Sequence, residues 1–235
     1  MASANSYQDR VQHAVELKEA VTLLDPPYHP ADSKFTLAKL TAAITSAETA
    51  NTEVEEKRVP YQDPTADRTA LFKSIPPLVT QALAYVKSNT AWSNRAEAVK
   101  KAADKVRGVR PPRGKKTPTD PQEDKKERER GEHSFVEVAA FLKTFIDRLE
   151  ALSGYAPQDD AISITSLRAL WSELDNLNKS IPITSQVLAD VIRDRKDLHI
   201  GEAGLKPVFD GVKQSVKGQY GQRSLQYKAV SGIRW

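Results

Sequence analysis

Apolar side chains recur every three or four residues along much of this 235-residue chain. In the segment 7–24 they are Val11, Ala14, Leu17, Val21 and Leu24, a spacing that predicts one face of an amphipathic helix. A stronger stripe covers 135–152, and its heptad-like positions are Phe135, Val138, Leu142, Phe145, Leu149 and Leu152. Such a stripe requires a partner helix. No segment alternates with period two for long enough to predict a strand, so the pattern predicts an all-α protein.

The pattern also occurs twice. Tyr-x-Pro-x-Asp stands at 28–32 and again at 155–159, and Asp-Arg-x-x-Leu stands at 67–71 and 194–198. Both pairs are separated by 127 residues, and so are two apolar quartets: Leu40, Ala43, Ile44 and Ala47 match Leu167, Leu170, Trp171 and Leu174. Val-x-Gly-[Val/Ile]-Arg closes each copy, at 106–110 and at 230–234. We interpret the chain as an internal duplication.

Proline, glycine and capping residues divide each copy into helices. Pro26 should end the first helix, and Ser33 and Asp160 are the expected N-caps of the second helices. Interruptions are expected at 60–64 and 74–77 in copy one and at 201–204 in copy two, with further helices over 77–88 and 205–217. Pro182 should kink or split the second helix of copy two.

The sequence between the copies has a different composition. Residues 111–133 are rich in Pro, Lys, Arg, Asp and Glu and nearly lack apolar side chains, which is typical of a flexible tether. We therefore predict a helical repeat unit over 1–110, a charged and partly flexible linker over 111–133, and a second helical unit over 134–235 that includes a C-terminal docking tail.

Charge and composition narrow the class of protein. The net charge of +4 is uneven, since residues 100–118 hold eight Lys or Arg side chains against one Asp. The chain has no cysteine, so disulfides and thiolate metal sites are excluded. No apolar run reaches the length of a membrane-spanning helix, and no signal-peptide pattern is visible. Cytoplasmic residence is the default expectation, with signal-independent export as the alternative.

No catalytic, metal or cofactor-binding constellation stands out. The four histidines, His13, His29, His133 and His199, share no ligand spacing, and no phosphate-binding loop or nucleophile elbow occurs. We predict that the protein is not an enzyme and has no cofactor.

Two arginines and two tyrosines are repeated with the duplication. Arg68 and Arg195 could each fork onto a carboxylate of a neighbouring helix or chain, or form a solvated Asp/Arg pair beside a core leucine. The latter is the more common arrangement. Tyr28 and Tyr155 are expected to pack a helix corner and to hydrogen-bond through their hydroxyl groups.

The basic segment offers a nucleic-acid surface as the alternative function. Clustered Lys and Arg side chains bind phosphate backbones by releasing counterions, although only Trp92 lies nearby to stack on bases. The candidate contacts are Lys100, Lys101, Lys105, Arg107, Arg110, Arg113, Lys115 and Lys116.

The C-terminal segment combines aromatic, basic and apolar side chains that are common at interfaces, namely Tyr220, Tyr227, Ile233, Arg234 and Trp235. It could dock on its own bundle or on a neighbouring chain. With the duplicated helical plan, the stretch Ser-x-x-Tyr-Lys-x-Val-Ser-Gly at 224–232 resembles a family of bacterial all-helical proteins that has no known activity. The resemblance implies a helical fold and no chemistry.

These observations favour a structural protein that self-associates, as a homo-oligomer or polymer, through its duplicated units and its tail. Arg68 and Arg195 belong to the expected contacts.

Overall fold

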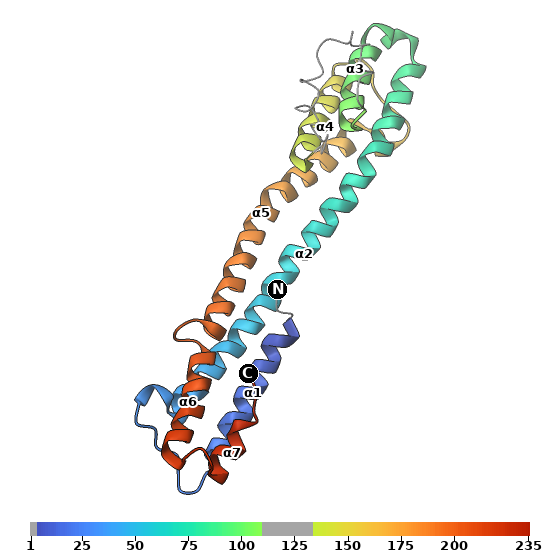
Figure 1. The fold of residues 1–235 in the computed structure, drawn as a ribbon. Coiled ribbons are helices and arrows are strands. Elements are labelled where there is room, and N and C mark those ends of the chain that lie inside the picture. Colours follow the sequence, from blue (N-terminus) through green and yellow to red (C-terminus); the bar gives the residue numbers. More distant parts are fainter. Residues whose placement is uncertain (1–3, 110–133) are drawn as a thin grey trace, which may run out of the picture. The chain divides into compact units, whose positions relative to one another are not determined.

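The computed structural model describes residues 4–109 and 134–235, and helices dominate both stretches (Figure 1). Short 3-10 turns at Ser33–Phe35, Thr90–Trp92 and Asp160–Ile162 precede three of the helices. Within these described residues there is no strand, so the all-α prediction is confirmed. The helices are α1 (Ala4–Thr22), α2 (Leu37–Ser88), α3 (Ser93–Val106), α4 (Phe135–Glu150), α5 (Ile164–Ile200), α6 (Leu205–Tyr220) and α7 (Leu225–Ser231).

The helices form two compact units. Unit 1 comprises residues 1–61 and 183–235, and unit 2 comprises residues 62–182. α2 and α5 each contribute one half to unit 1 and the other half to unit 2, so each unit combines residues from both sides of the predicted linker. The predicted linker, 111–133, lies outside the described residues.

Unit 1 has a hydrophobic core built from four helices, α1, α2, α6 and α7. The predicted apolar face of α1 is buried there, and Leu17 is completely enclosed. It packs with Leu40 of α2, Phe209 of α6 and Val230 of α7. The last turns of the chain are therefore part of a core and not an appendage to it.

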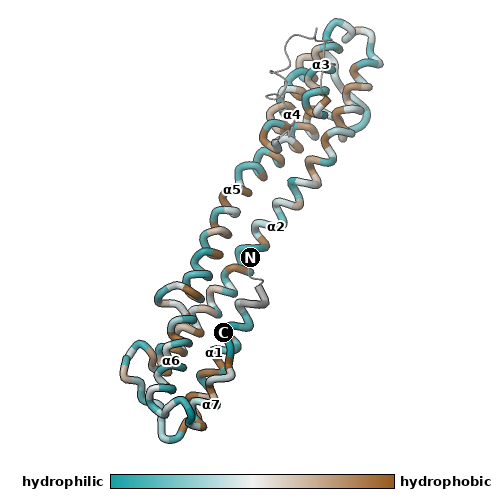
Figure 2. The backbone as a smooth tube through the Cα atoms, in the orientation of Figure 1, coloured by the Kyte–Doolittle hydropathy of each residue, from teal (hydrophilic) through white to brown (hydrophobic). Residues whose placement is uncertain are grey.

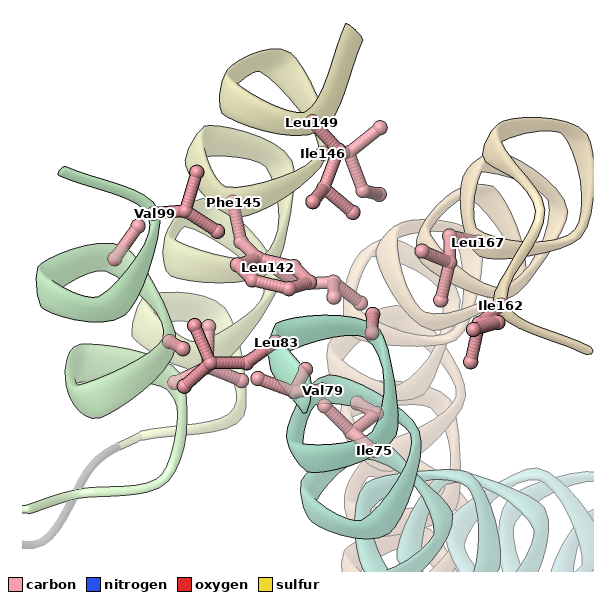
Figure 3. Packing of buried hydrophobic residues seen from close by; sticks show 14 of the residues in the cluster. Ile75, Val79, Leu83, Val99, Leu142, Phe145, Ile146, Leu149, Ile162 and Leu167 are labelled. Carbon is pink, nitrogen blue, oxygen red and sulfur yellow. The ribbon is translucent and has the colours of Figure 1, made fainter. Parts of the chain in front are cut away.

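The core of unit 2 surrounds α4, whose heptad-like stripe has the partner helices that the sequence requires. Phe145 is fully buried against side chains of α2, α3 and α5, including Leu83, Val99 and Leu167 (Figure 3). α3 and α4 lie side by side along their length (Figure 1). A capping box between Ser134 and Glu137 begins α4.

Both long helices begin with the same corner. Tyr28 donates to the carbonyl oxygen of Phe35 at 2.9 Å, and Tyr155 donates to that of Ile162 at 2.9 Å. The tyrosines thus pack and hydrogen-bond the corner, as predicted. Burial, followed by the charge of Tyr85, raises the pKa of Tyr155 to about 12, so its hydroxyl remains a donor at neutral pH.

The predicted N-caps of the second helices, Ser33 and Asp160, are wrong. Both are the first residues of 3-10 turns, and the residue before each caps that turn. Asp32 accepts from the amide of Lys34 at 2.8 Å, and Asp159 accepts from the amide of Ala161 at 2.9 Å. α2 and α5 begin after the turn, because a short helical turn is inserted where the sequence pattern suggested a single start.

Several predicted interruptions are absent. α2 runs unbroken through Pro60, Pro64, Pro76 and Pro77, although each proline removes a backbone donor. Burial of the neighbouring Ile75 accompanies the last two prolines. At Pro76 and Pro77 tertiary packing thus overrides local propensity, whereas Pro60 is exposed and no packing among the described residues accounts for the continuous helix there.

The break predicted in copy two is present. α5 ends at Ile200 and α6 begins at Leu205. A Cβ atom at Gly201 or Gly204 would lie 2.5 or 2.7 Å from the carbonyl oxygen of Asp197, so this tight turn requires glycine. Pro182, in contrast, lies inside α5 without splitting it.

No helix in the described part of the chain combines the length and the apolar character needed to cross a membrane.

Candidate functional site

The repeated arginine of unit 2 stacks on an aromatic ring. The guanidinium carbon of Arg68 lies 4.1 Å from the ring centroid of Phe135 on α4. Phe72, one turn after Arg68, meets the same ring edge-on at 5.0 Å. Asn178 of α5 donates its side-chain amide to the Phe135 carbonyl oxygen at 3.0 Å. Three helices thus meet at the start of α4.

Unit 1 contains the corresponding arrangement at the start of α1. The guanidinium carbon of Arg195 lies 4.3 Å from the ring centroid of Tyr7, and His199 meets that ring edge-on at 4.7 Å. His199 Nε2 lies 3.2 Å from Oδ1 of Asn51 on α2. An arginine, a ring one turn later, an aromatic partner and an asparagine recur, although Asn178 binds the backbone of the aromatic partner and Asn51 contacts the ring one turn after the arginine.

The two arrangements match the repeat in the sequence. Arg68 and Arg195, Phe72 and His199, and Asn51 and Asn178 are each separated by 127 residues, while Tyr7 and Phe135 are separated by 128. In each unit the arginine and the asparagine come from different copies. Each cluster therefore joins side chains from both of the stretches that the sequence pairs at this offset.

The cluster of unit 1 is the more polar of the two. His199 is completely buried and replaces a phenylalanine. The pKa of His199 is lowered from 6.5 to about 4. Burial is the largest cause, and the positive charges of Arg10 and Arg195 act in the same direction, whereas a hydrogen bond to the backbone of Ala47 acts against them. His199 is therefore neutral at pH 7, with its Nε2 proton assigned to the side of α2 and its Nδ1 atom buried without a partner.

Unit 1 also has a second arginine. The guanidinium carbon of Arg10 lies 5.1 Å from the ring centroid of Tyr7 and 5.7 Å from that of Trp235. In unit 2 the residue 128 positions later is Val138, which is buried. Neither Arg10 nor Arg195 has a carboxylate within 4.0 Å among the residues that the structure describes.

Neither sequence interpretation of Arg68 and Arg195 matches this geometry. Each guanidinium stacks on a ring of another helix instead of forking onto a carboxylate. Arg195 is only 7% exposed, so it is not part of a solvated pair, and Asp194 contacts Arg193 at 3.6 Å instead. The role of both arginines in self-association stays a prediction, and the burial of Arg195 makes it a poor contact for a second chain.

The C-terminal tail docks on its own chain. Tyr220 donates to the Pro26 carbonyl oxygen at 2.5 Å, and Lys213 donates to that of Ile233 at 2.7 Å. Trp235 meets Phe209 edge-on at 5.4 Å. Tyr227 also packs against the core of unit 1, whereas Arg234 is exposed. Of the two docking alternatives, the structure shows the intrachain one.

The structure describes four of the eight basic residues that were predicted to contact nucleic acid. Lys100 pairs with Glu97 at 3.8 Å and Arg107 pairs with Asp104 at 2.5 Å. Lys105 lies 5.9 Å from the ring centroid of Phe141, and Lys101 is exposed. The remaining candidates, Arg110, Arg113, Lys115 and Lys116, lie outside the described residues. Local acids thus neutralise part of the charge proposed for phosphate contacts, and nucleic-acid binding stays a prediction.

Sequence reasoning missed an exposed apolar stripe on α5. Ile183, Val187 and Leu198 are 67%, 41% and 40% exposed. They are four and eleven residues apart, which places them on one side of a helix. Ile192 and Ile200 add exposed apolar surface to the same segment, which Figure 2 shows as a mixture of hydrophobic and hydrophilic positions. The spacing is visible in the sequence, but only the structure shows that these side chains remain exposed among the described residues.

Metal ligands do not gather in the described part of the chain: no group of three or more His, Cys, Asp or Glu side chains is placed to hold an ion there.

Comparison with known proteins gives no relative: no family model, curated protein or solved structure matches the chain.

Proposed function

We propose that this protein has a structural role and associates with copies of itself through the α5 stripe, defined by Ile183, Val187 and Leu198. The single observation that carries the proposal is the exposure of these three apolar side chains on one side of a helix. Over 15 residues the stripe extends about 22 Å, at a rise of about 1.5 Å per residue. A stripe of this length suits a helix of similar length as its partner.

Charge favours a second copy over a nucleic acid as that partner. Between 183 and 200 the helix carries three aspartates and three Lys or Arg residues, of which Arg195 is buried. The charges at the surface therefore have a slight excess of acid, which does not attract a phosphate backbone. A two-fold interface uses the same patch on both chains, and the small net charge of this patch limits the repulsion between two copies.

The internal arrangement supports a structural role as well. Contacts such as Tyr85 to the Ala156 carbonyl oxygen, at 3.0 Å, and Gln226 to the Asp25 carbonyl oxygen, at 2.7 Å, join the two copies. The paired arginine clusters have the same property. We interpret the chain as a fused pseudo-dimer in which the two copies exchange their helices. A protein that evolved by pairing with itself provides a natural starting point for further self-association.

The α5 stripe replaces the tail as the proposed contact. The apolar side chains of the tail are used inside unit 1, so they are not available to a second chain without opening that core. Ile183 and Leu198 are available as the protein stands.

The test is a double substitution in the stripe. Ile183→Glu with Leu198→Glu places two charges in the proposed interface while leaving both cores untouched. Because burying one Ile or Leu side chain contributes about 1.5–3 kcal/mol when it is complete, we expect at least a tenfold weaker association. Leu225→Glu is the matched control, since Leu225 is 79% exposed, lies in unit 1 and is not part of the stripe.

Sedimentation velocity over a concentration series gives the association constants of the parent and both variants. The proposal requires weakening in the stripe variant alone. Equal weakening in both variants, or no change in either, would contradict it.

A further inference from the structure

Unit 1 differs from unit 2 in its positive charge. At the ring of Phe135 in unit 2 there is one guanidinium, that of Arg68. At the ring of Tyr7 in unit 1 there are two, those of Arg10 and Arg195, with carbon-to-centroid distances of 5.1 and 4.3 Å. Arg10 thus adds a second positive charge to an arginine-on-ring arrangement that needs only one arginine in unit 2.

The charges of unit 1 also have no compensating carboxylate within 4.0 Å among the residues that the structure describes. Arg195 is 93% removed from solvent, and its Nε atom is buried with no hydrogen-bond partner. Arg10 is half-buried, so one side of the cluster opens to solvent. A buried cation without a carboxylate is costly, and ring stacking offsets only about 2 kcal/mol of that cost. Two guanidinium groups that share one ring as a neighbour thus hold more positive charge than the described residues balance.

The hydrogen-bond donors of the two arginines also favour an anion as the missing partner. Guanidinium groups present N–H donors in a fixed fork that matches the oxygens of a phosphate. His199 and Asn51 border the cluster with further polar atoms, and the unit 2 counterpart of His199 is apolar. Because His199 is neutral at pH 7, the two arginines supply two charges, which equals the charge of a phosphate monoester at this pH.

We propose that Arg10 and Arg195 form a binding site for a dianionic phosphate group beside Tyr7 in unit 1. The phosphate oxygens accept from the open N–H groups of the two guanidiniums, and the ring of Tyr7 holds both side chains in place. Arg195 lies on α5 three residues before Leu198, but the proposed site does not use the exposed side chains of the α5 stripe and does not depend on self-association.

Inorganic phosphate is the probe for the first experiment. Its dissociation constant is measured by isothermal titration calorimetry on the full chain, with sodium chloride at matched ionic strength as the reference. Arg10→Gln removes one fork from a half-buried position. We expect it to weaken phosphate binding at least tenfold, since a hydrogen bond to a charged group contributes about 1.5–3 kcal/mol. Arg10→Lys keeps the charge but not the fork, and we expect an intermediate loss.

Arg68→Gln is the matched control, because it removes the equivalent stacked arginine from the unit that lacks a second one. It should leave the dissociation constant unchanged. Circular dichroism of each variant establishes that the helices are retained, and Arg10→Lys provides the comparison if Arg10→Gln is not folded.

Any of three outcomes would overturn the proposal. The first is a phosphate affinity that is the same in the parent, Arg10→Gln and Arg10→Lys. The second is binding that persists in Arg10→Gln and disappears when Lys115 and Lys116 are both replaced by Gln, which would assign the phosphate to the basic segment. Absence of measurable binding by the parent at millimolar phosphate would overturn it equally.

Discussion

Buried His199 predicts a loss of stability in mild acid. Its pKa in the folded protein is about 4, below the 6.5 of the ordinary side chain. The unfolded chain therefore binds the proton more tightly than the folded one, and stability that is complete above about pH 6.5 falls as the pH drops towards 4. With 1.36 kcal/mol for each pKa unit, the linkage amounts to about 2 kcal/mol at pH 5 and about 3 kcal/mol at pH 4.

The groups around His199 explain the direction. Arg10 and Tyr7 face it from α1, Asn51 faces it from α2, and Arg195 lies one turn earlier on its own helix. Protonation would add a third positive charge to two that are already present, in a place from which water is excluded. Both desolvation and repulsion oppose it.

His199→Phe is the perturbation that isolates this effect, because phenylalanine occupies the equivalent place in unit 2. Urea denaturation followed by circular dichroism gives the free energy of unfolding at pH 7 and at pH 5. The parent should lose about 2 kcal/mol more than His199→Phe over this interval. His29→Gln, at an exposed position, should retain the pH dependence of the parent. An equal loss in the parent and in His199→Phe would refute the reasoning.

Three further predictions concern packing. Gly211→Ala should destabilise the protein by about 1–3 kcal/mol, because its Cβ would overlap the ring of Phe35, whereas Gly218→Ala on the same helix has open space and should be neutral or stabilising in thermal unfolding. Val230→Ala should cost about 2 kcal/mol in urea unfolding, since the side chain is fully buried; a change near zero would show that the tail is not part of the core. Tyr155→Phe should cost about 1 kcal/mol by removing the corner hydrogen bond, and a neutral effect would remove that bond from the account.

The local features of the fold were predictable from the sequence. The buried face of α1, the stripe on α4 and the hydroxyl bonds of Tyr28 and Tyr155 follow from spacing and residue type. The break between α5 and α6 follows from two glycines whose positions tolerate no side chain. In each case the determining interactions lie within a few residues along the chain.

Features that depend on distant contacts were not predictable. Pro76 remains inside α2 beside the buried Ile75, whose packing supports the helix there. α2 contributes side chains to both hydrophobic cores, and α5 is divided between the two compact units. A repeat in the sequence does not indicate which stretch completes which unit.

The arginine cluster shows the same limit at the level of a site. Repetition marked Arg68 and Arg195 as special, but the rings that they contact lie on α4 and α1. Nothing in the sequence around Arg195 identifies Tyr7, Asn51 or Arg10 as its neighbours. The signal that could have found them is the 127-residue correspondence of Asn51 with Asn178, read together with that of the two arginines.

Sedimentation equilibrium of the unmodified chain tests the central claim most directly. The chain has a mass of 26.0 kDa, and the account predicts a weight-average mass that rises with concentration towards a multiple of this value. Self-association through an apolar surface should also persist at high salt, because it does not rest on ion pairs. A mass of 26.0 kDa at every concentration up to about 100 μM would contradict the proposed self-association. A dissociation constant above that concentration would correspond to no more than about 5 kcal/mol of binding free energy.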